Sequence, residues 1–260
     1  MSLILSSRRT PKGTDAAAIR KWGMIFLTIG IIGQCILQNR LLNMNSVTGN
    51  ELLGAMESDP MVMPLLTAAL ICKIIETCAA PLFAFLLVEG FQRTRSFEKY
   101  LIRVGVVALI SELPYNLAYS GKLFELSSRN PVFGLFICMV MLYFYTRYPD
   151  KGMKNFAMKA LITLAAFLWC LMLHIDQGIC LVVMVAMLWY ARSKSNERAV
   201  LGFCSAMVCT LFDMYYIGSC LAFIMLHRYD EERGEQNEKL NYAFYPAMLL
   251  IVGILAKFLG

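Results

Sequence analysis

Acidic residues and prolines lie inside apolar runs between residues 76 and 118, which is where chemistry is most readily placed. One apolar run carries Pro81 and ends at Glu89, a basic hinge follows, and a second run carries Glu112 and Pro114. An isolated charge in hydrocarbon costs roughly 2.5–3.5 kcal/mol on insertion scales, so such residues usually face a bundle interior or a polar cavity. These acids are therefore candidates for proton transfer or for substrate binding.

The hinge after Glu89 is basic and predicts a phosphate-binding mouth. Its basic residues are Arg93, Arg95, Lys99 and Arg103. Guanidinium groups match the geometry of phosphate oxygens, so the hinge suits the phosphates of a cytosolic donor. The alternative is an orientation signal with a capping carboxylate. The candidate cofactor-binding residues are Glu89, Arg93, Arg95 and Arg103.

Two places offer a general base. Glu112 lies two residues before Pro114, and a carboxylate in a kinked helix suits a base or a substrate ligand. Its alternative role is to pair with Lys73 or to cap backbone donors that the proline frees. His174 and Asp176 share a short turn, where a histidine beside a carboxylate would act as a base near neutral pH, or the turn is simply solvated. The predicted catalytic residues are Glu112, His174 and Asp176.

Lys73 and Glu76 are three residues apart, a spacing at which helical side chains pair. We predict an ion pair between them. The candidate substrate-binding residues are Lys73, Glu76, Asn116 and Asn130. The chain has two histidines and no CxxC motif, so we expect neither a metal site nor a disulfide framework.

The composition predicts what positions these residues. The chain is 58% hydrophobic and 16% charged, with a mean hydropathy of +0.60, whereas soluble domains are about 45–50% apolar and about 25% charged. We predict an all-α polytopic transmembrane helix bundle in the lipid bilayer, formed by residues 22–260 as a single domain. Residues 1–21 read as a polar, mobile cytoplasmic tail. The net charge of +6 comes from short basic loops and is not a nucleic-acid signal.

The apolar runs predict about nine spans, some of them short or broken by proline. They cover about 22–38, 61–91, 101–119, 131–145, 160–173, 179–190, 199–226 as two short spans broken at Asp213, and 242–258. Eight spans remain an alternative. With a cytoplasmic N-terminus, most of the 24 lysines and arginines fall on the cytoplasmic side.

The central block resembles the TraX family of bacterial membrane proteins. It reads AAPLFAFLLVEGFQRTRSFEKYLIRVGVVALISELPYNLAYSG from residue 79 to 121. The resemblance extends more thinly to 130–133, 176–178, 232–234 and 244–246. It therefore covers most of the chain.

This resemblance implies an activity. The family takes its name from the acetylation of a conjugative pilin, and it is similar to transmembrane acyltransferases such as the heparan-glucosaminide acetyltransferases. The resemblance implies that acetyl-CoA or another acyl-CoA is the donor of the acyl group. The acceptor would be a peptide, pilin-like subunit or glycan at the outer side of the bacterial cytoplasmic membrane.

The chain also departs from the family pattern. Members commonly carry Asp-His-Ile-Gly where this chain has Gly30-Ile31-Ile32-Gly33. Asn116 stands in place of an aspartate and Met248 in place of a late histidine. A catalytically impaired relative that serves as a membrane binding or assembly subunit is therefore a second hypothesis. Proline-broken helices with intramembrane charge make a secondary transporter the third.

Overall fold

The computed structural model describes residues 13–44, 48–125, 127–149, 152–192, 195–235 and 237–258. In these ranges every regular element is a helix, and two isolated bridges join Thr14 to Tyr229 and Arg129 to Ile175. The predicted all-α class is confirmed. The helices are α1 (Ala16–Ile32), η1 (Gly33–Leu41), α2 (Gly49–Ser58), α3 (Val62–Thr77), α4 (Ala79–Arg93), α5 (Phe97–Ser120), α6 (Val132–Tyr145), α7 (Met153–Met172), α8 (Gly178–Tyr190), α9 (Ser195–Cys209), η2 (Met214–Ser219), α10 (Cys220–His227) and α11 (Glu238–Phe258).

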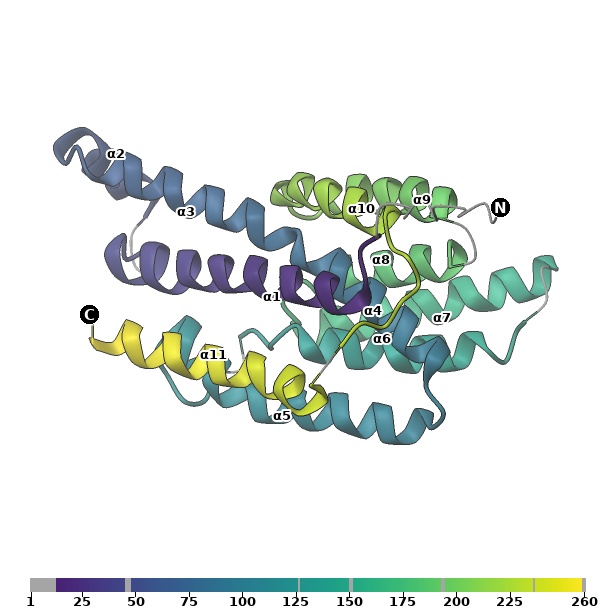
Figure 1. Ribbon diagram of the computed structural model, residues 1–260. Coiled ribbons are helices and arrows are strands. Elements are labelled where there is room, and N and C mark those ends of the chain that lie inside the picture. The colour runs from purple at the N-terminus through teal and green to yellow at the C-terminus, as the bar shows by residue number, and fades with distance from the viewer. Residues whose placement is uncertain are drawn as a thin grey trace, which may run out of the picture.

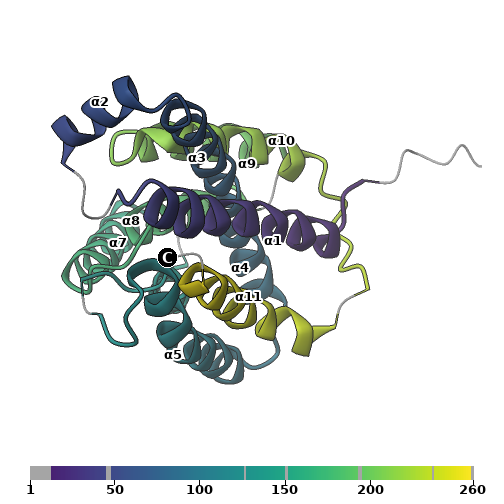
Figure 2. The same cartoon turned by 90° about the vertical axis from the view of Figure 1, so that its left-hand side faces the viewer.

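Several long helices lie along one axis of an elongated bundle. Figure 1 shows α1, α3, α5 and α11 along this axis, with α6, α7 and α8 gathered toward one end. In Figure 2, α1 crosses the middle of the bundle between α3 and α11, and it packs against both. Helix α4 forms the centre, because nearly all its residues from Ala79 to Val88 are buried and it packs against α1, α6, α8 and α10.

Five helical stretches in the described residues are long and apolar enough to cross a membrane. They cover Ala16–Leu41, Val62–Arg93, Phe97–Ser120, Met153–Met172 and Leu240–Phe258. The apolar helices Val132–Tyr145, Gly178–Tyr190 and Met214–His227 are shorter than a full crossing. The predicted count of about nine spans is therefore not confirmed.

Helix boundaries differ from the sequence prediction at two places. Helix α1 begins at Ala16, where the Asp15 side chain accepts a 2.7 Å hydrogen bond from the Ala18 amide, so it starts before the predicted span. Residues 1–12 of the predicted tail lie outside the described residues. The long second span is interrupted at Cys78 and not at Pro81, which sits in the first turn of α4 where it removes no helical hydrogen bond.

The interruption at Cys78 is fixed by a neighbouring short helix. Thr77 Oγ1 donates to the carbonyl oxygens of Ile74 at 2.7 Å and Tyr215 at 3.0 Å. The predicted break at Asp213 is confirmed, since α9 ends at Cys209 and Asp213 caps η2 by accepting from the Tyr215 amide at 3.0 Å. The two breaks therefore meet in space.

Gly218 tests this contact. A Cβ at Gly218 would overlap the backbone carbonyl oxygen of Ile74, whereas a Cβ at Gly54, on α2, would meet nothing within 4 Å. We expect Gly218→Ala to destabilise the protein by about 1–3 kcal/mol through overpacking. Gly54→Ala is the control and should stabilise by about 0.5–1 kcal/mol. Thermal unfolding in detergent measures both, and equal shifts for the two variants would contradict the packing described.

Candidate functional site

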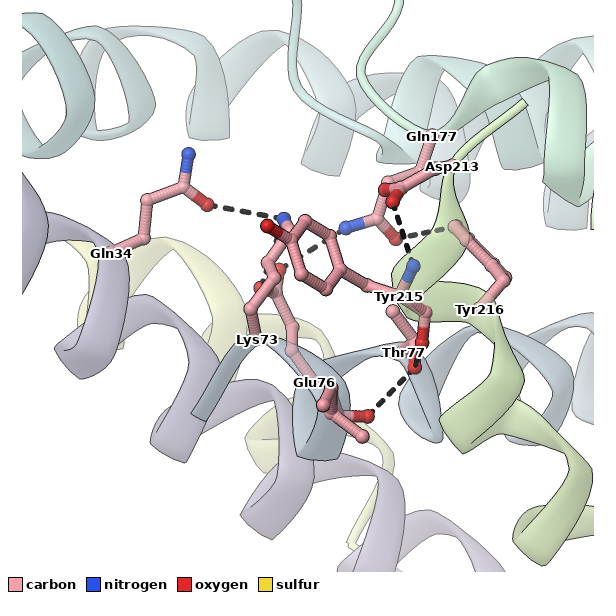
Figure 3. Close-up of polar contacts among 9 residues, drawn as sticks. Gln34, Lys73, Glu76, Thr77, Gln177, Asp213, Tyr215 and Tyr216 are labelled. Atoms are coloured by element: carbon pink, nitrogen blue, oxygen red, sulfur yellow. Dashed lines mark hydrogen bonds and ion pairs between the residues drawn. The ribbon is translucent and has the colours of Figure 1, made fainter. Parts of the chain in front are cut away.

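A buried ion pair lies at the centre of the bundle. Lys73 Nζ lies 3.2 Å from Glu76 Oε2, and only 2% of the Glu76 side chain is exposed. The same ammonium group donates to Gln34 Oε1 at 3.2 Å (Figure 3). The predicted Lys73–Glu76 pair is therefore present, and it joins α3 to η1.

Gln177 extends this cluster toward α8 and η2. Its Nε2 donates to Glu76 Oε1 at 3.1 Å, and its Oε1 accepts from the Tyr216 hydroxyl at 3.1 Å (Figure 3). Gln177 directly precedes α8 and has a left-handed backbone conformation, with φ of 55°. This conformation directs the chain from the turn into α8.

Carboxylates outnumber cations around Lys73. In the described part of the chain, the Lys73 ammonium interacts electrostatically with Glu76, Asp176 and Asp213. Glu76 is the carboxylate that contacts the Lys73 ammonium group, and Asp176 and Asp213 add negative charge around it.

Glycines in the first helix make room for the cluster. A Cβ at Gly30 would overlap the Glu76 side chain, and one at Gly33 would overlap Cys72. Gly30 stands where the Asp-His-Ile-Gly pattern has its aspartate, whereas Gly33 matches the glycine of that pattern. The absence of a side chain at position 30 thus gives Glu76 its place between α1 and α3.

Glu112 lies in a second cluster, which ties α5 to the start of α6. It accepts hydrogen bonds from Arg129 Nη1 at 3.2 Å, from the Asn130 amide at 3.3 Å and from Asn130 Nδ2 at 2.7 Å. Asn130 Nδ2 also donates to the Ala108 carbonyl oxygen at 2.9 Å. The cation that Glu112 meets is therefore Arg129, and the predicted alternative of a pair with Lys73 is wrong because Lys73 is held by Glu76.

The structure separates His174 from Asp176. The His174 side chain is exposed at a residue with φ of 49°. The backbone of this turn is bonded to Arg129, whose amide donates to the His174 carbonyl and whose carbonyl accepts from the Asp176 amide, both at 2.9 Å. Asp176 interacts electrostatically with Lys73, so we group it with the central cluster. Asn116 is buried on α5 and its carbonyl accepts from Ser120 Oγ at 2.7 Å.

A cavity of about 540 Å³ joins this region to the basic hinge. The charged residues that line it are Arg20, Glu89, Arg93, Arg95, Lys99, Arg103 and Arg233. Its lining also includes Ala79 and Gln177, and Ala79 opens the helix that Arg93 closes. Since a helix rises 1.5 Å per residue, the two ends of the cavity are roughly 20 Å apart. All four predicted cofactor-binding residues therefore line one cavity.

Polar contacts tie the residues at the rim of the cavity to one another. Glu89 pairs with Arg93 and accepts a 2.9 Å hydrogen bond from the Tyr229 hydroxyl. Arg93 Nη2 also donates to the Glu231 carbonyl oxygen at 2.8 Å. Burial and the hydrogen bond to Glu89 raise the pKa of Tyr229, so its hydroxyl keeps the proton that it donates. These contacts hold residues 228–235 against the end of α4.

A comparison with known families identifies the family of the chain. The model of the family described as TraX protein matches residues 21–256. The chain belongs to the TraX family. No curated protein and no solved structure matches it. Membership in the TraX family, together with the apolar helices, indicates a membrane protein.

Sequence reasoning missed several residues of the site. Gln177, Gln34 and Tyr216 are neutral, and Arg129 lies in a loop, so none carries the signal of a charge inside an apolar run. Their partners are distant in sequence. Gln177 alone had a local signal, because it lies in the Asp176–Gly178 segment of the TraX resemblance.

The central pair makes a stability prediction. Lys73→Met leaves Glu76 buried without its cation, which should destabilise the protein by about 3–5 kcal/mol. The double variant with Glu76→Gln should recover much of this loss. Lys122→Met is the control, since its pair with Glu125 is at the surface and is worth about 0–1 kcal/mol. Thermal unfolding checks this, and a loss for Lys73→Met no larger than for Lys122→Met would count against a buried pair.

Proposed function

We propose that this TraX-family protein transfers an acyl group, typically acetyl, from a cytosolic acyl-CoA to an acceptor at the outer side of the bacterial cytoplasmic membrane. The observation that carries the proposal is the cavity, which has basic residues at one end and Gln177 of the central cluster at the other. The N-terminus and the basic mouth are then cytoplasmic. This assignment agrees with the excess of lysine and arginine on that side.

The mouth suits the phosphates of coenzyme A. Arg93, Arg95, Lys99 and Arg103 come from the end of α4 and the start of α5 and line the same opening. Charge-assisted bonds from guanidinium to phosphate are among the strongest in proteins. Apolar side chains line the rest of the cavity, and they suit a thin pantetheine arm; they include Phe83, Leu86, Val107, Leu135 and Leu181.

The inner end suits the thioester. Pro131 and Gln177 line it, and they directly precede α6 and α8. The positive ends of these helix dipoles favour negative charge that develops on the carbonyl oxygen. The acceptor's amine or hydroxyl would bond to the carbonyl carbon, the carbon–sulfur bond would break, and CoA would leave as the thiol.

Asp176 and Glu76 are the proposed bases that take the acceptor's proton. Both belong to the cluster with more carboxylates than cations. Glu112 has a positioning role in this scheme, because its bonds to Arg129 and Asn130 fix the start of α6. His174 has no part in proton transfer in this scheme, because the residue is exposed.

An impaired relative that acts as a binding or assembly subunit is the second candidate. The observation in its favour is that positions 30 and 248 carry no ionisable group. The space beside Gly30 is occupied by the Glu76 side chain. Met248 is buried in an apolar cluster with Ile31 and Tyr115. Turnover of acetyl-CoA by the purified protein would favour the acyltransferase over this second candidate and over a transporter.

The donor site can be tested by calorimetry with coenzyme A and detergent-purified protein. We expect micromolar binding that weakens about tenfold in Arg95→Ala or Lys99→Ala, because each loses a bond to a charged group worth about 1.5–3 kcal/mol. Arg147→Ala is the control, since Arg147 is exposed and bonds Tyr143 outside the cavity. Equal losses in the variants and the control, or no binding at all, would reject the donor site.

The proposed bases can be tested by acyl transfer to a pilin-like peptide. Asp176→Asn should lower turnover about 10²–10⁴-fold, which is typical of a lost general base, while CoA binding stays unchanged. His174→Ala should retain activity. The assignment fails if Asp176→Asn and Glu76→Gln both retain full activity, or if His174→Ala alone abolishes transfer.

A further inference from the structure

Arg198 on α9 is a buried cation that belongs neither to the central cluster nor to the lining of the cavity. Only 4% of the residue is exposed, and its Nε and Nη1 groups have no hydrogen-bond partner in the described structure. The guanidinium carbon lies 5.1 Å from the centre of the Phe85 ring and 5.6 Å from that of Tyr229. Aromatic faces attract a cation but do not replace the hydrogen bonds that a buried guanidinium has lost.

Glu89 is the one carboxylate on α4, the helix whose Phe85 ring lies under the Arg198 guanidinium. Phe85 and Glu89 are four residues apart, so they lie one turn apart on the same face of the helix. Arg93 lies one further turn along. Glu89 is thus flanked by a cation on either side, since Arg93 holds it now and Arg198 lies over the preceding turn.

Side chains on a helix lean toward its N-terminus, which is the direction of Phe85 and Arg198. A rotamer of Glu89 that leans in this direction would bring its carboxylate toward Arg198. The Tyr229 hydroxyl, which now bonds Glu89, belongs to the ring that Arg198 touches. Tyr229 and Phe85 also pack edge to face, with ring centres 4.9 Å apart. The Tyr229 and Phe85 rings would therefore lie beside Glu89 whether it pairs with Arg93 or with Arg198.

Arg93 is not free to bind a phosphate in this arrangement. It is paired with Glu89 and donates to the Glu231 carbonyl oxygen. A phosphate at the mouth competes for the same guanidinium. Once Arg93 turned to the phosphate, Glu89 would be left without a cation in a position where 18% of its side chain is exposed.

We propose that Glu89 exchanges Arg93 for Arg198 when a phosphate group of the ligand takes Arg93. Arg198 is then a positioning residue that stabilises the ligand-bound arrangement of the mouth, and it does not touch the ligand. The exchange also releases Arg93 from Glu231, and so loosens residues 228–235 at the rim. This inference rests on the proposed function for the identity of the phosphate ligand, but the partner exchange itself can be tested without a ligand.

The test is a double-variant cycle on thermal unfolding of the full chain without ligand. Arg93→Met leaves Glu89 with Arg198, and Arg198→Met leaves it with Arg93, so each should lower Tm by no more than about 2 °C. The double variant leaves Glu89 with neither cation and should lower Tm by about 5 °C or more. Glu89→Gln in the double variant should remove this excess. Arg147→Met combined with Arg198→Met is the matched control and should be additive.

Additive shifts for Arg93→Met and Arg198→Met would overturn the exchange. So would an Arg198→Met shift as large as that of the double variant, because Arg198 would then serve packing alone. Coenzyme A provides the second readout: Arg198→Met should weaken its binding about tenfold, and should have no further effect in a Glu89→Gln protein. If the wild-type chain binds no coenzyme A, the proposed function fails and the unfolding cycle alone decides the exchange.

Discussion

The charge of Glu76 inside an apolar bundle is the constraint on which the rest of the structure depends. A buried carboxylate is tolerated only with a cation and further hydrogen bonds, and here Lys73 and Gln177 provide them. Gln177 in turn fixes the start of α8 and, through Tyr216, the short helix η2. The close approach of α1 at Gly30 completes the enclosure. The interruption of the second span at Cys78 lies in the same place, so one polar centre organises four chain segments.

In the proposed function, the cavity connects this centre to the donor. A charge cluster sealed in hydrocarbon would only destabilise the fold. Here, however, Gln177 lies at the end of a cavity whose opening is lined by arginine and lysine. The opening is itself held by Glu89, Arg93 and Tyr229. The basic opening and the end beside Gln177, roughly 20 Å apart along α4, are thus connected by largely apolar walls. In the proposed function, the opening binds the donor and the central cluster accepts the proton.

Features set by neighbours in sequence were predictable, and features set by long-range packing were not. The Lys73–Glu76 pair follows from helical spacing, and the basic hinge follows from its composition. The partner of Glu112 was not predictable, because Arg129 approaches it through a loop. His174 and Asp176 are neighbours in the sequence, yet His174, with a left-handed backbone, is exposed, whereas Asp176 is partly buried. The span count was not confirmed because α6, α8 and η2–α10 are apolar but too short for a full crossing.

The most direct test is an experimental structure of the protein in a lipid nanodisc with coenzyme A, determined by cryo-electron microscopy. The account predicts phosphates among Arg93, Arg95 and Lys99, the thiol end beside Gln177, and an intact Lys73–Glu76 pair behind it. Coenzyme A bound outside this cavity, or a cavity filled by lipid acyl chains in the presence of saturating coenzyme A, would contradict it.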